Sequence, residues 1–272
     1  MCSSDLGHSV ELFNGFYLDV TGEFIETSPI TNYEFGEWSS DLIENNVPRS
    51  FEVYQIFRLY TEIQYTPFQK YITEPKQKIV LGSKWPSFSL LYEKGVPGVF
   101  GSDINFDYLR VNVLQDFKLK TFGTSTYKVQ FGKFLTKESL TYEVKKNYPR
   151  GDRWFFSSPM QNQLQNFTLL SEEWSFDAHY VHHFNGAIVN YIPLIKKLRI
   201  HTLAGLNYLY VADNDYHYAD FYFGLERVIR LQRQRFRLGV YFVYGGSSYQ
   251  LSKPTIQFAI NHYNKREKSW GY

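Results

Sequence analysis

In a chain of 272 residues, 29 Lys and Arg oppose 27 Asp and Glu, which leaves a formal net charge of +2. That balance gives no reason to expect a nucleic-acid partner, because phosphate binding requires a strong basic excess. Aromatic residues make up 19% of the chain, which excludes a disordered protein. The mean hydropathy of −0.37 and the lack of any apolar run of about 18 residues exclude a transmembrane helix. They leave a transmembrane β-barrel open, because its strands alternate lipid-facing and lumen-facing residues.

The first six residues, Met1–Leu6, look like a translated sequencing-adapter fragment. We therefore expect residues 1–6 to be a non-native leader on a truncated gene, and residues 7–272 to form one barrel domain. On this interpretation, the lack of a signal peptide at the start says nothing about export. Cys2 is the only cysteine in the sequence, so neither a disulfide framework nor a cysteine-based zinc site is expected.

Apolar and polar residues alternate with a period of two along most of the chain, as in half-buried β-strands. No segment carries a sustained helical stripe, so the sequence predicts an all-β fold. The polar segments 27–46 and 145–163 are predicted to be loops, and Pro86 either interrupts a strand or precedes its start. In chain order, the alternation predicts strands near 9–26, 51–65, 78–92, 104–121, 124–135, 174–184, 199–211, 217–226, 235–245 and 255–263.

Several of these stretches run for about 10–15 residues, whereas soluble strands have a mode of about 5–6 and membrane-spanning strands need about 9–11. We therefore predict an antiparallel transmembrane β-barrel with roughly 12 strands in this chain. Val240 is expected to face lipid. The charges expected to face the lumen are Arg58, Glu62, Asp177 and Arg237. The alternative is a soluble β-sandwich or barrel that binds carbohydrate or another ligand on exposed aromatic side chains.

The predicted connections 185–198 and 227–234 fall on one side of the sheet together with the chain end, and all three are basic. Bacterial outer-membrane barrels usually end on the periplasmic side, where these turns would meet the phospholipid leaflet. Anionic headgroups attract such basic residues. Ordinary solvated turns are the alternative. The residues expected to contact headgroups are Lys196, Lys197, Arg230 and Arg233.

Five motifs recur in order and carry a resemblance to a known family: Pro67–Ile72, Gly82–Gly95, His182–Gly186, Ile192–Leu198 and Phe223–Glu226. The sequence resembles, over about residues 50–264, a family of large outer-membrane proteins of unknown function with an N-terminal carboxypeptidase-regulatory-like domain. The resemblance implies an outer-membrane β-barrel that forms the C-terminal part of a longer protein. Its implied role is structural, in transport or in outer-membrane assembly. The family supplies no catalytic residues.

The histidines at positions 179, 182 and 183 suggest a metal site, but strand geometry argues against it. His179 and His183 share a face and lie about 13 Å apart at ~3.3 Å per residue. Zinc requires each imidazole nitrogen within about 2.1 Å. His182 points to the other face, so we interpret all three as residues of the barrel wall.

Other candidate sites are equally weak. Asp213–Asp215, with Asp220 nearby, lacks the glycine and the terminal glutamate of a calcium loop. No nucleophile elbow surrounds Ser247 and Ser248, and no phosphate-binding or dinucleotide motif occurs. We therefore predict no enzyme, no cofactor, and no catalytic or metal-binding residues, with the lipid bilayer of the bacterial outer membrane as the partner. A group of arginines could bind lipid phosphate through planar forks or be solvated: Arg227, Arg230, Arg233, Arg235 and Arg237.

Overall fold

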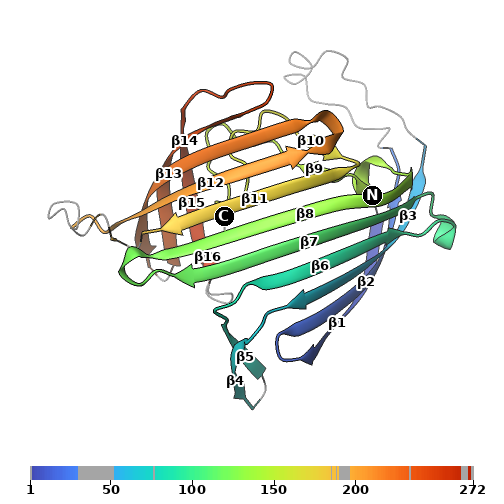
Figure 1. Ribbon diagram of the computed structural model, residues 1–272, viewed down its shortest axis with the longest axis horizontal. Coiled ribbons are helices and arrows are strands. Elements are labelled where there is room, and N and C mark those ends of the chain that lie inside the picture. The colour runs from blue at the N-terminus through green and yellow to red at the C-terminus, as the bar shows by residue number, and fades with distance from the viewer. Residues whose placement is uncertain are drawn as a thin grey trace.

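The computed structural model describes residues 2–29, 52–75, 77–184, 186, 187, 189, 197–232, 234–264 and 269–270. The fold is all-β, as predicted. One antiparallel sheet holds eleven strands, and the short β16 lies beside β15 (Figure 1). Along the sheet these are β1 (Cys2–Phe13), β2 (Phe16–Thr27), β3 (Tyr54–Tyr65), β6 (Ser87–Gly95), β7 (Asn105–Lys118), β8 (Thr124–Ser139), β11 (Trp174–His183), β12 (Ile200–Val211), β13 (Tyr216–Leu231), β14 (Gln234–Ser247), β15 (Thr255–Asn264) and β16 (Ser269–Trp270).

The sheet is a meander that curls strongly, with β13 to β15 turning behind the front strands (Figure 1). Two small two-stranded sheets lie outside its ladder, one formed by β4 (Lys70–Glu74) with β5 (Gln77–Gly82) and one by β9 (Lys146–Tyr148) with β10 (Leu169–Ser171). Among the described residues, no ladder joins β1 to β15. None of the described helices has the length and apolar character needed to span a membrane. The described helices are 3₁₀ turns: η1 (Val99–Gly101), η2 (Lys120–Phe122), η3 (Tyr142–Val144) and η5 (Ala212–Asn214).

The two faces of the sheet differ in chemistry. We call the face that carries Val240 the outer face, and the face against residues 140–173 the inner face. On the outer face the side chains of Val240 and Ile260 are 46% and 73% exposed. On the inner face of the same two strands, Tyr241 and Gln257 are 0% exposed. The predicted alternation is therefore confirmed in these strands, and the apolar outer rows are not packed in a core.

Glycines on the inner face make room for aromatic rings on neighbouring strands. Gly205 pairs directly with Tyr222, and Gly224 with Tyr241. A Cβ on Gly205 would overlap the Tyr222 hydroxyl, and one on Gly224 would meet the Tyr241 ring at 2.5 Å. The buried tyrosines of β13 and β14 thus lie over glycines of the strand before, an arrangement that supports strand curvature.

Several predicted boundaries were wrong. The stretch 9–26 contains two strands, because Asn14 and Gly15 form a tight hairpin turn and Gly15 has a φ of +82°. The predicted connection 227–234 is mostly strand, since β13 continues to Leu231 and β14 begins at Gln234. Pro86 does precede a strand, because β6 begins at Ser87. The predicted loop at 27–46 lies largely outside the described residues.

We predict that Gly205→Ala lowers the free energy of unfolding by about 1–3 kcal/mol, because its methyl group would overlap the Tyr222 ring. Gly22→Ala is the matched control, since a Cβ there would make ordinary contacts, with Leu59 Cδ2 at 3.5 Å and the Phe57 ring at 3.9 Å. Chemical unfolding in detergent measures both variants. Equal unfolding midpoints for the two variants would contradict this prediction, because they would show that the Tyr222 ring moves aside without a loss of stability.

Candidate functional site

Residues 140–173, which connect β8 to β11, form a segment that folds against the inner face of the sheet (Figure 1). We call it the inward segment. Near its start, the Tyr148 hydroxyl donates to Ser175 Oγ at 2.6 Å, and burial raises the pKa of Tyr148 to about 12. At its end, the carboxylate of Asp213 accepts the Ser171 hydroxyl at 2.8 Å and the Glu172 N–H at 2.9 Å. Both ends are therefore fixed by hydrogen bonds.

The middle of the inward segment is held by a buried carboxylate on β13. Asp220 accepts hydrogen bonds from the backbone N–H of Gln163 at 2.7 Å, from the Tyr218 hydroxyl at 2.7 Å and from Asn207 Nδ2 at 2.8 Å. The Tyr218 hydroxyl also accepts the N–H of Leu164 at 2.7 Å. Buried polar groups require such partners, so the segment and the sheet satisfy each other.

The inward segment also reaches the edge of the sheet at β15. The Phe258 N–H donates to the Trp154 carbonyl at 2.8 Å, and the Phe156 N–H donates to the Phe258 carbonyl at 2.9 Å. The Phe156 ring stacks on Tyr241, with centroids 3.7 Å apart and an interplanar angle of 5°. Residues 154–156 therefore act as a short added strand.

A cavity of about 290 Å³ lies between the inward segment and strands β7, β8 and β11. We call it the inner cavity. Its lining contains four cationic side chains and one carboxylate: Arg110, Lys128, Lys146, Arg150 and Asp177. Lys146 Nζ lies 2.5 Å from Glu93 Oε2. Burial lowers the pKa of the Lys146 ammonium, and the Glu93 carboxylate opposes this shift.

A second cavity, of about 560 Å³, lies beside the inner cavity over strands β1 to β3 and β6. It shares Arg110 and Lys146 with the inner cavity. Arg58 lies within it and contacts Glu23 at 2.7 Å and Glu93 at 3.4 Å. Carboxylates outnumber cations in its lining, so we call it the acidic cavity; they are Asp5, Asp19, Glu23, Glu62 and Glu93.

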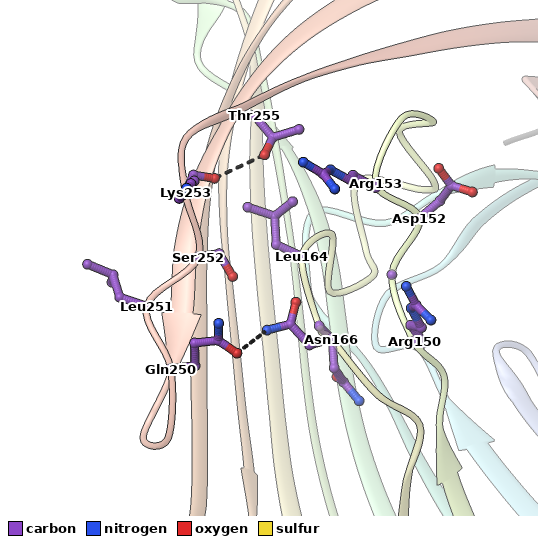
Figure 2. A pocket seen from close by; sticks show the side chains of 12 residues that line it. Arg150, Asp152, Arg153, Leu164, Asn166, Gln250, Leu251, Ser252, Lys253 and Thr255 are labelled. Atoms are coloured by element: carbon purple, nitrogen blue, oxygen red, sulfur yellow. Dashed lines mark hydrogen bonds between the residues drawn. The ribbon is translucent and has the colours of Figure 1, made fainter.

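A third cavity, of about 380 Å³, lies between the inward segment and the β14–β15 connection (Figure 2). We call it the mouth cavity. Its exposed cations are Arg150, Arg153 and Lys253. Asn166 Nδ2 donates to Gln250 Oε1 at 3.3 Å across it (Figure 2). Arg150 and Gly151 line both this cavity and the inner cavity, so the three cavities follow one another along the inner side of the sheet.

The four charges predicted to face the lumen all lie on the inner face. Arg58 and Glu62 line the acidic cavity, and Asp177 lines the inner cavity. Arg237 on β14 lies with Nη1 3.5 Å from Oε2 of the buried Glu226 on β13.

The histidines that suggested a metal site have different surroundings. His179 is buried, with Nδ1 2.7 Å from Asn207 Oδ1 and Nε2 2.9 Å from Asp177 Oδ2. His182 lies on the outer face beside Ser125 Oγ at 2.7 Å. Within the described ranges, no group of three or more His, Cys, Asp or Glu could hold a metal ion.

The calcium-ligand candidate and the cations expected at lipid headgroups also have assigned places in the structure. Asp213, considered as a calcium ligand, instead binds the end of the inward segment. Lys197 and Arg230 are exposed, whereas Lys196 and Arg233 lie outside the described residues. Arg230 is part of β13 and faces Arg235 across the ladder, so it is not in a turn as predicted. Arg235 lies over the Tyr263 ring, with Cζ 5.5 Å from the centroid.

Sequence reasoning missed the inward segment as a folded element. Residues 145–163 were predicted to be a loop, and their polarity gave no sign that they fold against the sheet. Their backbone groups pair with side chains far along the chain: the Gln163 N–H donates to Asp220 at 2.7 Å, and the Asp152 carbonyl accepts from Gln257 Nε2 at 2.6 Å. The available signal was the run of inward polar residues on the opposing strands, including Asn207 and Asp220.

One family model matches the chain over residues 3–225, and it is described as the C-terminal domain of a family of unknown function (DUF5686). This is more than half of the sequence. The match begins earlier and ends earlier than the resemblance at residues 50–264. No match is found among the curated proteins.

We predict that Phe156→Ala loosens the inward segment, because it removes the ring stacked on Tyr241 and leaves a buried cavity. Such truncations cost about 3–5 kcal/mol. Trypsin cleavage after Arg150 and Arg153 is expected to accelerate at least tenfold. Phe155→Ala is the control, since that neighbouring ring is exposed. Equal cleavage rates in both variants would contradict the anchoring role of Phe156.

Proposed function

The chain belongs to this family of unknown function (DUF5686), and from that premise we propose that it forms the wall of a β-barrel in the bacterial outer membrane, with a transport role. In this proposal the outer face contacts lipid and the three cavities belong to a polar passage that the inward segment partly fills. The family's N-terminal carboxypeptidase-regulatory-like domain, expected from the resemblance, would precede the barrel. No catalytic step is part of the proposal.

The observation that carries the proposal is the contrast between the two faces. Apolar residues on the outer face are exposed in strand after strand, from Val20 on β2 to Ile260 on β15. Monomeric soluble proteins rarely expose continuous apolar patches above a few hundred Å². A hydrocarbon environment makes such a surface favourable, because each strand then places its apolar row in lipid and its polar row inside.

Aromatic residues at both ends of the outer face support the same proposal. At one end, Trp174 and Tyr210 have ring centroids 4.7 Å apart. At the opposite ends of the strands, Phe13, Phe16 and Tyr65 form a second group, with Phe13 stacked on Phe16 at 4.8 Å. Transmembrane barrels carry aromatic girdles at both membrane interfaces.

Strand lengths and connections fit a membrane as well. β7, β13 and β14 contain 14, 16 and 14 residues, more than the roughly 9–11 that a tilted spanning strand requires. We assign the end with the β13–β14 turn to the periplasmic side, where the exposed Lys197 and Arg230 would be near anionic headgroups. The mouth cavity, at the other end, would then open to the outside.

A soluble ligand-binding module is the second candidate, and one observation favours it. Trp174, Phe176, Tyr208 and Tyr210 surround an open surface hollow that could stack against a sugar. The same residues would form part of an aromatic girdle in a barrel. The two candidates differ in what they require of the outer face, which is lipid for the barrel and water for the module.

Extraction tests the proposal directly. We expect the protein to fractionate with membranes, to require detergent for extraction, and to migrate on a gel at different apparent masses before and after boiling. Closed membrane barrels resist unfolding by the gel detergent until they are heated, because every backbone group is paired. A folded, monodisperse protein in detergent-free buffer would favour the soluble module and refute the membrane proposal.

Replacing Val240 by Arg should disfavour insertion by about 2–4 kcal/mol, the cost of a cation near the bilayer midplane. The folded fraction after addition of liposomes, measured by the heat-dependent gel shift, reports this loss. Leu251→Arg is the control, because Leu251 is exposed in the β14–β15 connection and lies outside the proposed lipid band. Equal insertion of the two variants would contradict the assignment of β14 to the membrane.

A further inference from the structure

We propose that the inner cavity is a binding site for a small oxyanion, a solute with a phosphate or carboxylate group, held between Arg110 and Lys128. This inference deepens the transport proposal and rests on it for the route by which the solute arrives. The binding itself requires only the folded domain.

Arg110 and Lys128 differ from the other cations of the inner face. Arg58, Lys146 and Arg237 each lie within 4.0 Å of a carboxylate oxygen. In the part of the chain that the structure describes, Arg110 and Lys128 form no salt bridge and no hydrogen bond, although both side chains are only partly exposed. A cation removed from water is unfavourable without a partner, so these two groups favour an incoming anion.

The balance of charge in the inner cavity points the same way. Lys146 is paired with Glu93, which leaves three cations of the lining opposite one carboxylate, Asp177. Asp177 Oδ2 lies 2.9 Å from His179 Nε2, and its Oδ1 has no hydrogen-bond partner among the described residues. Asp177 pairs with Gln130 across the β8–β11 ladder, and Gln130 also lines the cavity as a further amide donor. Arginine presents a planar fork that matches phosphate and carboxylate oxygens, and lysine adds a compact charge.

The volume limits the ligand to small molecules. About 290 Å³ corresponds to roughly ten waters at ~30 Å³ each. That space admits inorganic phosphate or a small organic acid. A phospholipid is disfavoured, because its acyl chains would have to lie among the charged and amide side chains of the lining.

Cationic side chains also line the route from the mouth cavity to the inner cavity. Arg153 and Lys253 line the mouth cavity (Figure 2). Arg150 lines both the mouth cavity and the inner cavity. Arg110 and Lys146 stand at the next junction, between the inner cavity and the acidic cavity. An anion entering from the mouth therefore meets three cations and one carboxylate, Asp152, and the five carboxylates of the acidic cavity lie beyond the site. Clefts lined by one sign of charge raise the local concentration of the opposite ion.

Calorimetric titration of the full chain in detergent with inorganic phosphate, at low ionic strength, tests the site. We expect saturable binding that is at least tenfold weaker in the double variant Arg110→Gln/Lys128→Gln, because each charged hydrogen bond contributes a tenfold factor or more. Lys133→Gln is the control. It removes one positive charge from the exposed outer face of β8 and should leave the affinity unchanged.

A second measurement uses the unaltered protein, in case the double variant does not fold. Phosphate should slow acylation of Lys128 by an amine-reactive reagent and leave that of Lys133 unaffected. Absence of phosphate binding, unchanged affinity in the double variant, or no protection of Lys128 would each overturn the proposal. So would loss of binding only in Arg153→Gln/Lys253→Gln, which would place the anion in the mouth cavity. Binding by a protein that fails the extraction test would keep the site and refute the membrane role alone.

Discussion

The continuous antiparallel hydrogen-bond ladder is the constraint on which the rest of the structure depends. Between β12 and β13 the register runs from the pair Ile200–Arg227 to the pair Val211–Tyr216 without a shift. Because side chains alternate across a strand, a slip of one residue would exchange the two faces entirely. The ladder therefore fixes, for every strand at once, that Tyr222 and Asp220 point inward while Phe221 points outward. The outer face stays apolar from strand to strand, and buried polar groups such as Asp220 stay on the inner face, only because the register is maintained.

Once the polar rows face inward, they need partners. The inward segment supplies many of them through its backbone, as the N–H of Gln163 does for Asp220 and the Pro159 carbonyl does for Tyr222. Ion pairs supply others, as Glu93 does for Arg58 and Lys146. The inner face thus combines hydrogen-bonded polar groups with two hydrophobic clusters, one around Phe156 and Tyr241 and the other around Ile56 and Phe106. Arg110 and Lys128, which have no such partner among the described residues, both line the inner cavity.

The sequence predicted much of the sheet, because a period of two is a local property that any single strand reveals. The predicted strands at 174–184, 199–211 and 255–263 differ from the observed ones by at most one residue at either end. Asn14 and Gly15 were overlooked within a weakly alternating stretch, although that pair is a strong hairpin signal. The segment Arg227–Leu231, with its two arginines, resembled a turn, yet pairing with β14 keeps it in β13.

The site was far less accessible to sequence reasoning. Arg58, Glu62, Asp177 and Arg237 could be assigned to a face by parity alone, which says nothing about their partners. The cavities depend on residues 140–173 crossing the inner face, and that path is set by contacts with β11 to β15. Polar loops that fold inward look the same in sequence as polar loops in water. The glycines opposite Tyr222 and Tyr241 likewise acquire meaning only when the neighbouring strand is known.

The added strand at residues 154–156 gives the two borders of the sheet unequal protection. Along β15, Trp154 and Phe156 occupy the peptide groups of Phe258, and Trp270 of β16 pairs with Tyr263. Along β1, no described residue covers the side away from β2. Uncovered strand borders are templates for further β pairing. An additional strand would have to displace residues 154–156 to pair with β15, whereas it would displace no described residue at β1. The sheet would therefore be extended at β1 more readily than at β15.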